Sequence, residues 1–357
     1  MSREVRQKII IKNVSVLRAN GEVQSADIMI EDDKIAFVGR VINGNVLADR
    51  VKHIKIIDGK GKFAIPGFVN AHTHASMTLL RSYSDDKSLM DWLEKDIWPI
   101  EAQMKRKDIY YGAALAAVEM IKSGTTAFAD MYGPWMEEVA KVVDESGLRG
   151  ILSRGLIGVS DGDNKLAENV DLYKNCNGAA EGRIKVMFGP HAIYTCPPDY
   201  LKKVAKEASK LGAEIHIHMN ETETEIKDCR KKYNNPPFVV VNETGLFDCG
   251  TLAAHCVYLC ENEIDVIKDK NIRIAHNPGS NMKLASGMAP LMRLLNDGIT
   301  VGLGTDGASS NNNLDILEEA RLSALFYKVI KPSPTVIPAL TALKMATEYG
   351  ANAVGLK

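Results

Sequence analysis

The stretch "PGFVNAHTHASM", residues 66–77, places two histidines one residue apart at the end of an apolar run. Side chains two positions apart in a β-strand share a face, so His72 and His74 converge on one spot while Thr73 faces the other way. Neutral imidazole is a common metal ligand, and a strand that presents two of them supplies part of a metal site. A hydrogen-bonded polar pair at a strand end is the alternative, and the stretch alone leaves both open.

Strand-like runs with intervening helix-length amphipathic stretches continue from this segment to the end of the chain. This alternation is typical of a parallel sheet. Eight repeats favour a (β/α)8 barrel over a doubly wound sheet, since no Gly-rich dinucleotide fingerprint follows any run. We predict an α/β fold with a TIM-type barrel over residues 61–357, built on strands in the ranges 63–74, 125–132, 149–158, 183–195, 213–222, 251–259, 271–281 and 300–310.

The first 60 residues have a different pattern. Short β-rich runs at 8–17, 24–30, 35–39 and 51–57 are separated by Gly, Asn and Asp turns. They predict a small β-sandwich domain over residues 1–60, which contains His53.

Seven of the eight histidines lie in the predicted barrel strands, most of them near the carboxyl ends, where the active site of such a barrel is built. Histidines scattered over a surface would not select strands so consistently, so this placement favours the metal interpretation. The seven are His72, His74, His191, His216, His218, His255 and His276.

The predicted ligands are three imidazoles, from His72, His74 and His218, and the carboxylate of Asp306. His218 lies nearer the strand end than His216, which we expect deeper in the barrel. This donor set suits one Zn²⁺ ion, with Fe²⁺, Mn²⁺ or Ni²⁺ as alternatives, because affinity alone does not choose among them. Such an ion lowers the pKa of bound water from 15.7 to about 7.

A carboxylate that does not bind the metal can transfer protons between the water and a leaving group. Glu221, three residues after His218, is the candidate for this role. Glu223 and Glu225 open the following helix, and we expect both to be solvated.

Composition narrows the class of partner. Lysines and arginines number 44 and acidic residues 45, so the formal net charge is −1, which gives no electrostatic footprint for nucleic acid or an anionic membrane. The sequence shows no pattern of a signal peptide and no apolar run long enough to span a membrane. We expect a soluble, cytoplasmic enzyme with a small-molecule substrate. A homo-oligomer is compatible with the sequence, although the sequence identifies no subunit interface.

Six motifs in order resemble the 5′-methylthioadenosine/S-adenosylhomocysteine deaminases of the amidohydrolase superfamily. The resemblance implies a mononuclear metal site and hydrolysis of an adenine nucleoside (5′-methylthioadenosine, S-adenosylhomocysteine, adenosine or 5′-deoxyadenosine) to its inosine derivative and ammonia. The motifs are "PGFVNAHTHASM", "LMDWLEKDIWPIEAQM", "HMNETETE", "AHCVYL", "AHNPGSNMKLASGMAP" and "GLGTDGASSNNNLD".

The resemblance also implies residue roles. Four residues match the metal ligands of the family, namely His72, His74, His218 and Asp306. Glu221 and His255 match its catalytic pair. Water would attack carbon 6 of the adenine ring, with Asp306 and His255 orienting and deprotonating it while Glu221 protonates ring nitrogen 1.

Three further residues resemble substrate-binding positions of the family. Glu101 in "WPIEAQM" matches a residue that binds the ribose hydroxyls, and His191 in "GPHAIYT" matches a histidine that contacts adenine. Arg154 matches an arginine used for substrate, including the homocysteine carboxylate. Glu221 and Asp306 also face the substrate in this scheme.

The chain departs from the family pattern in two places. Where the family can offer a second arginine, only Lys165 is nearby, and lysine lacks the planar fork of arginine. The Gly-rich segment that completes the small sandwich in family members is not found before the last residue, Lys357, so we expect the C-terminal strands of the sandwich to be absent.

Other enzymes share parts of this pattern. Guanine or pterin deaminases and triazine chlorohydrolases have the paired histidines and the last-strand aspartate, whereas "WPIEAQM" and "SNNNLD" favour a nucleoside. A binuclear hydantoinase-like enzyme would need a carboxylated lysine at the end of the fourth strand, where Lys185 lies too early. A noncatalytic barrel protein would have lost metal ligands, and all are present.

Overall fold

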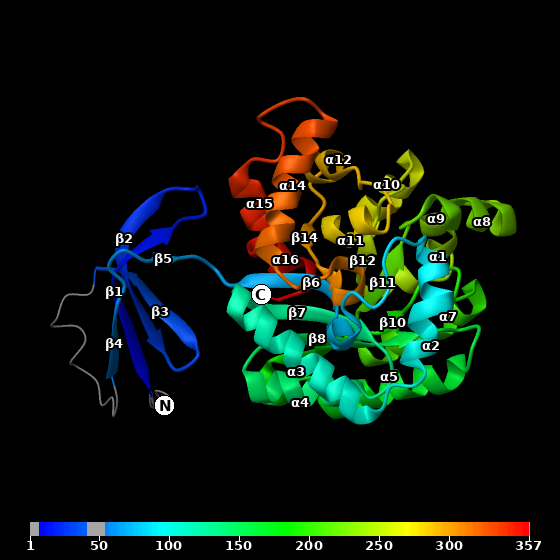
Figure 1. Ribbon diagram of the computed structural model, residues 1–357, viewed down its shortest axis with the longest axis horizontal. Coiled ribbons are helices and arrows are strands. Elements are labelled where there is room, and N and C mark those ends of the chain that lie inside the picture. The colour runs from blue at the N-terminus through cyan, green and yellow to red at the C-terminus, as the bar shows by residue number, and fades with distance from the viewer. Residues whose placement is uncertain (1–6, 41–53, 357) are drawn as a thin grey trace. The chain divides into compact units, whose positions relative to one another are not determined.

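The computed structural model describes residues 7–40 and 54–356. The chain divides into two compact units, Met1–Pro66 and Gly67–Lys357 (Figure 1). His53 and residues 51–53 of the predicted strand 51–57 lie outside the described residues.

The first unit is a single sheet with the order β3-β2-β1-β4, in which β5 also pairs with β1. Alternate side chains such as Ile10, Val14 and Ile28 bury one face. Residues 63–64 pair with β1, although we predicted them in the first barrel strand, and Pro66 and Gly67 separate them from that strand. The strands are β1 (Lys8–Leu17), β2 (Val23–Glu31), β3 (Lys34–Gly39), β4 (Ile54–Asp58) and β5 (Phe63–Ala64).

All eight predicted barrel strands are present in the second unit, two of them as interrupted pairs. The strands are β6 (Phe68–His74), β7 (Thr125–Tyr132), β8 (Arg149–Leu156), β9 (Ile184–Val186) with β10 (Gly189–Pro190), β11 (Ile215–Met219), β12 (Thr251–His255), β13 (Arg273–His276), and β14 (Val301–Leu303) with β15 (Asp306–Gly307).

Parallel pairing connects these strands into a closed ring. One sheet has the order β10-β8-β7-β6-β15 and the other the order β11-β12-β13-β14. A parallel bridge between Phe188 and Ile215 joins the two sheets, and β15 pairs with β6 at Asp306 and Thr73. The predicted (β/α)8 barrel is therefore confirmed.

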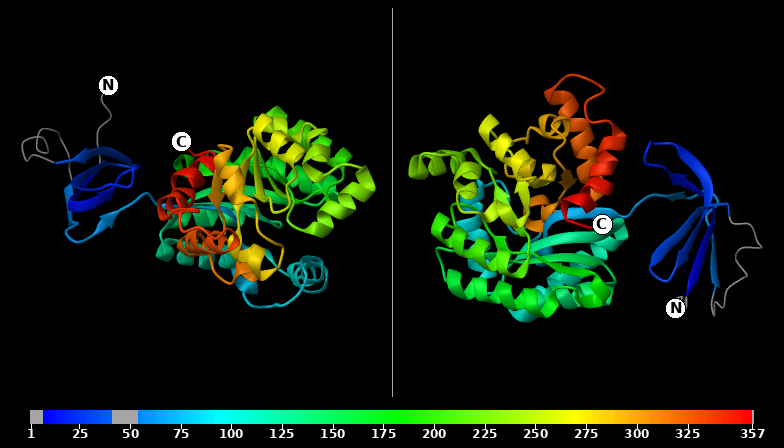
Figure 2. Two further views of the ribbon diagram at one scale, coloured as in Figure 1. Left: turned by 90° about the horizontal axis from the view of Figure 1, so that it is seen from above. Right: turned by 180° about the vertical axis from the view of Figure 1, so that it is seen from behind.

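Helices surround the ring (Figures 1 and 2). Small apolar side chains such as Ala71, Ala129 and Ala254 fill its interior, and larger ones pack between strands and helices. The longer helices are α3 (Arg106–Ser123), α4 (Met136–Ser146), α5 (Gly162–Cys176), α7 (Pro198–Leu211), α8 (Glu223–Tyr233), α10 (Glu261–Asp269), α14 (Ile316–Ile330) and α15 (Ala339–Ala346).

Shorter helical segments lie mainly in the connections. They include α1 (Leu89–Trp92), η2 (Leu93–Ile97) and α2 (Trp98–Glu101), which form one continuous stretch, and α9 (Pro237–Asn242), α11 (Pro278–Lys283), α12 (Leu291–Asn296), α13 (Ala308–Asn311) and α16 (Glu348–Ala353). Within the described residues, no helix has the length and apolar character needed to cross a membrane.

Candidate active site

Three histidine rings meet at one end of the barrel, each held through its Nδ1 atom. His74 Nδ1 donates to the carbonyl of Met131, and His218 Nδ1 donates to the carbonyl of His191 at 2.8 Å. Because a carbonyl only accepts, Nδ1 of both rings carries a hydrogen, and Nε2 of both rings is the nitrogen left to face the site. His72 Nδ1 lies 2.8 Å from Nε2 of His216, and Nε2 of His72 is buried without a hydrogen-bond partner.

The carboxylate of Asp306 lies beside two of these rings. Its Oδ1 atom is 3.0 Å from Nε2 of His74 and 3.5 Å from Nε2 of His72. Burial alone would raise the pKa of Asp306, but the adjacent His72 and His74 rings hold it well below its usual range. The structure thus brings together His72 and His74, from β6, and the carboxylate of Asp306, from β15.

The donor atoms fit a metal ion. His72, His74 and Asp306 form one set whose donor atoms lie within 4.8 Å of one another, and His72, His218 and His255 form a second. A buried nitrogen without a partner costs free energy. Lone pairs of imidazole and carboxylate that converge in this way are what zinc and similar ions bind.

His255 and Glu221 lie next to the same point. Nδ1 of His255 is 2.8 Å from Oδ1 of Asn281, and its Nε2 is 3.7 Å from Oε2 of Glu221. Burial raises the pKa of Glu221. Sequence reasoning assigned His255 to proton transfer, and the structure adds that its ring nitrogen lies among the potential ligand atoms.

Glu225 contradicts the expectation that it is solvated. It is buried, and its carboxylate accepts from the backbone N–H groups of Asn220 at 3.1 Å and Glu221 at 2.8 Å. Asn220 has a positive φ of 53°, and this turn leaves both N–H groups in need of an acceptor. Glu223 is exposed, as expected, and pairs with Lys227.

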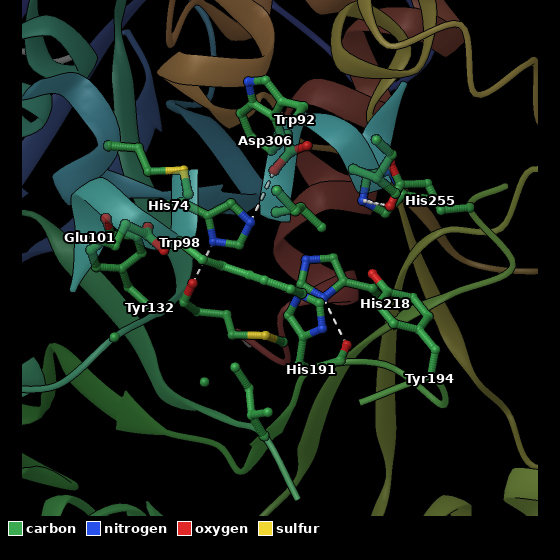
Figure 3. Close-up of a pocket in the computed structure, with 18 of the residues that line it drawn as sticks. His74, Trp92, Trp98, Glu101, Tyr132, His191, Tyr194, His218, His255 and Asp306 are labelled. Atoms are coloured by element: carbon green, nitrogen blue, oxygen red, sulfur yellow. Dashed lines mark hydrogen bonds and ion pairs between the residues drawn. The ribbon is translucent and has the colours of Figure 1, made fainter. Parts of the chain in front are cut away.

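A pocket opens from the histidine cluster (Figure 3). Trp92 and Trp98 form part of its wall. Glu101 also lines it, and one carboxylate oxygen of Glu101 is buried without a hydrogen-bond partner. Burial raises the pKa of Glu101, partly offset by a hydrogen bond with Tyr132.

His191 and Arg154 line the same pocket. Burial, reinforced by neighbouring histidines, lowers the pKa of His191 to about 3, so this ring is neutral. Two guanidinium nitrogens of Arg154 are already occupied, since Nε lies 2.6 Å from Glu168 and Nη1 donates to the Gly155 carbonyl at 2.7 Å. Lys165 does not line this pocket, and its ammonium group donates to the Ser160 carbonyl.

Sequence reasoning missed three polar residues that contact the site. Ser280, Asn281 and Ser286 hydrogen-bond with Asp306, His255 and Glu221, respectively. Ser280 and Asn281 are the last two residues of the predicted strand 271–281, and Ser286 follows five residues later. That position could have indicated a role, because the carboxyl ends of barrel strands and the loops after them carry the active site.

Comparisons with known proteins agree with this fold. The model of the Amidohydrolase family matches residues 63–357. A 5-methylthioadenosine/S-adenosylhomocysteine deaminase of Pelotomaculum thermopropionicum is 51% identical over 98% of the chain and 81% of its own length. A 5′-deoxyadenosine deaminase of Methanosarcina acetivorans is 47% identical over 97% of the chain and 80% of its own length.

The fold of this chain is also similar to that of a solved structure. The adenosine deaminase from Xanthomonas campestris with bound zinc is 30% identical and superposes with a TM-score of 0.90, covering 99% of this chain and 80% of its own.

Proposed function

The chain belongs to the amidohydrolase family, and we propose that it is a metal-dependent deaminase that hydrolyses adenine nucleosides to their inosine derivatives and ammonia. The observation that carries this proposal is the placement of Glu221 and His255 beside the convergent histidine and aspartate donors, at the inner end of a pocket that also contains Glu101. The names of the similar deaminases support an adenine nucleoside as substrate.

His72, His74, His218 and Asp306 would hold one divalent ion, which we propose to be zinc. The zinc in the similar adenosine deaminase supports this choice. A divalent ion bound there lowers the pKa of water from 15.7 to about 7, so a nucleophile is available at neutral pH. The backbone carbonyls that accept from His74 and His218 fix the ring orientations, as partners of metal-binding histidines commonly do.

Asp306 and His255 accept the proton of the attacking water in this scheme. His255 has its Nδ1 beside the side-chain amide oxygen of Asn281, so its Nε2 faces the site with a free lone pair. Glu221, whose pKa is raised by burial, donates a proton to ring nitrogen 1 while water adds to carbon 6. The proton accepted from the water then passes to the amino group, which leaves as ammonia, while the hydroxyl proton on the oxygen at carbon 6 returns to Glu221, so the carbonyl of the inosine product forms.

Glu101 and His191 hold the nucleoside. The buried, unpartnered oxygen of Glu101 can accept from a ribose hydroxyl. His191 is neutral and can hydrogen-bond to the adenine ring without adding charge. Arg154 lines the wall of the same pocket, where it can meet the 5′ substituent.

The test is an ultraviolet assay with zinc-loaded protein. Methylthioadenosine, S-adenosylhomocysteine, adenosine and 5′-deoxyadenosine are incubated separately, and the absorbance of adenine is followed as it changes to that of hypoxanthine. We expect conversion, and loss of conversion after chelation with recovery on adding zinc. If none reacts although the metal content is confirmed, the proposal is wrong, and guanine, pterin and triazine substrates should be assayed in the same way.

A further inference from the structure

Three side chains of one short segment contact the three groups to which we assign proton transfer. We infer that residues 280–286, within α11 and just after it, form a positioning element in which Ser280 orients Asp306, Asn281 orients His255 and Ser286 orients Glu221. This inference rests on the proposed function. None of the three side chains lines the pocket, so they act through the residues that they contact.

Ser280 fixes the rotation of the Asp306 carboxylate. Its hydroxyl donates to Oδ2 at 2.6 Å, while Oδ1 faces Nε2 of His74 at 3.0 Å. Ser280 is fully buried, so no bulk water competes for this bond. The carboxylate therefore keeps one oxygen toward the histidines and the other toward the segment.

Asn281 selects the protonation site of His255. The amide oxygen of Asn281 lies 2.8 Å from Nδ1, closer than the amide nitrogen of Asn277 at 3.4 Å, so the shorter contact favours a hydrogen on Nδ1 and a lone pair on Nε2. That lone pair is on the side of Glu221, whose Oε2 is 3.7 Å from Nε2. Without the amide oxygen, the imidazole would lose the interaction that favours this tautomer and ring orientation.

Ser286 orients the third proton-transfer group, the carboxylate of Glu221. Its hydroxyl lies 3.3 Å from Oε1 of Glu221, the oxygen opposite the one that faces His255. The backbone N–H of Ser286 donates to the carbonyl of Asn281 at 2.9 Å, which joins the two ends of the segment.

The segment is itself anchored to the barrel. The buried carboxylate of Glu319, on α14, accepts from the N–H of Gly279 at 2.8 Å and from Nδ2 of Asn311 at 2.9 Å. A Cβ atom at position 279 would lie 2.5 Å from Oε1 of Glu319, so glycine permits this close approach. An anchored segment can transmit a fixed geometry to the three side chains that it contacts.

The experiment compares Ser280→Ala, Asn281→Ala and Ser286→Ala in zinc-loaded protein. Ser323→Ala is the matched control, because Ser323 is equally buried on α14 and its hydroxyl has no hydrogen-bond partner. We expect kcat to fall about 10- to 100-fold in each of the three variants, a loss comparable to that caused by removing a partner that orients a metal ligand. KM should change less than about twofold, and Ser323→Ala should keep both constants.

A second readout does not depend on turnover. In ¹⁵N spectra of histidine-labelled, zinc-loaded protein, the signal lost in His255→Ala identifies His255. This signal should report hydrogen on Nδ1 in the wild type and a changed tautomer distribution in Asn281→Ala. Metal analysis should show reduced zinc only in Ser280→Ala.

Unchanged kcat in the three variants, a rise in KM alone, or an Nε2–H tautomer in the wild type would each overturn the inference. An equal loss of activity in Ser323→Ala would assign the effect to packing and overturn it as well. If the wild type converts no adenine nucleoside, the proposed function is wrong, whereas the tautomer and the zinc content still report whether the segment orients these side chains.

Discussion

Glu221, Glu223 and Glu225 are separated by one residue each, yet their surroundings give them three different roles. Glu221 lies against His255, Glu223 is solvated, and Glu225 holds the backbone of the turn that carries Glu221. The spacing from His218 predicted that Glu221 faces the site, and the structure places its carboxylate 3.7 Å from Nε2 of His255. The role of Glu225 was not predictable, because it depends on the positive φ of Asn220, which composition does not encode.

Replacing Glu221 by glutamine should remove a proton donor while keeping the shape of the side chain. We expect Glu221→Gln to lower kcat by about 10²- to 10⁴-fold for adenine nucleosides, the usual contribution of a positioned acid or base. Zinc content, measured by elemental analysis, should stay at the wild-type level. Glu223→Gln serves as the control and should retain full activity; full activity in Glu221→Gln would exclude Glu221 from this role.

Replacing Glu101 by alanine should weaken nucleoside binding. Loss of hydrogen bonds from ribose hydroxyls to a carboxylate predicts a KM about 10- to 100-fold higher, because bonds to charged groups contribute roughly 1.5–3 kcal/mol. Steady-state kinetics with adenosine measure this change. Glu94→Ala, an exposed change on the same helical stretch, is the control, and an unchanged KM in Glu101→Ala would rule out the ribose contact.

At the scale of elements, strand β12 and the interrupted eighth strand, β14 with β15, each carry one residue of the site in an unusual backbone conformation. His255 and Asp306 have φ values of 71° and 61°, unusual for residues other than glycine. Such conformations persist only where surrounding contacts enforce them, and they are concentrated at functional sites. The periodicity of apolar residues predicted where the strands lie, but it gives no information on the backbone conformation of His255 and Asp306.

The ion pair between β8 and α5 makes a prediction about substrate preference. Glu168 neutralises Arg154, the one lysine or arginine among the described residues that line the pocket. Glu168→Gln should release the guanidinium and raise kcat/KM for S-adenosylhomocysteine, relative to methylthioadenosine, several-fold. Competition assays with both substrates measure the ratio. Asp171→Asn, one helical turn away, is the control, and a fall in the ratio would instead indicate that Glu168 binds the substrate ammonium.

Contact between α14 and α11 should make stability depend on pH. Burial raises the pKa of Glu319 to about 8 from 4.5, even though Gly279 and Asn311 donate to it. Because the folded pKa exceeds the unfolded one, the stabilising contribution of protonated Glu319 is complete below about pH 4.5 and is lost as the pH rises through about 8. Denaturant midpoints between pH 5 and 9 should fall less steeply in Glu319→Gln than in the wild type. Glu318→Gln, at an exposed neighbouring position, should follow the wild-type curve, and parallel curves for all three proteins would contradict this assignment.

At the scale of the whole molecule, the sequence predicted every barrel strand, because buried parallel strands are apolar runs bounded by turns and amphipathic helices. The sequence placed residues 63–64 in the first barrel strand, whereas they pair with β1. A strand of two residues is too short to show a periodic pattern of apolar side chains. The positioning segment was missed because the sequence does not distinguish a serine or asparagine that contacts solvent from one that contacts a buried side chain of the site.

Barrel closure has a consequence for biosynthesis. Strand β15 pairs with β6, so the two strands that meet at the closure are among the first and last parts of the barrel to leave the ribosome. His72 and His74 emerge more than 200 residues before Asp306, so the full donor set forms only after nearly all of the barrel has been synthesised. Zinc bound across this junction would favour the closed ring, because a ligand that binds only the folded state stabilises it. Hydrogen exchange after chelation should therefore accelerate first at the amides of β6 and β15, while exchange in the β7–β8 pair stays slow; uniform acceleration across the barrel would show that closure does not depend on the metal.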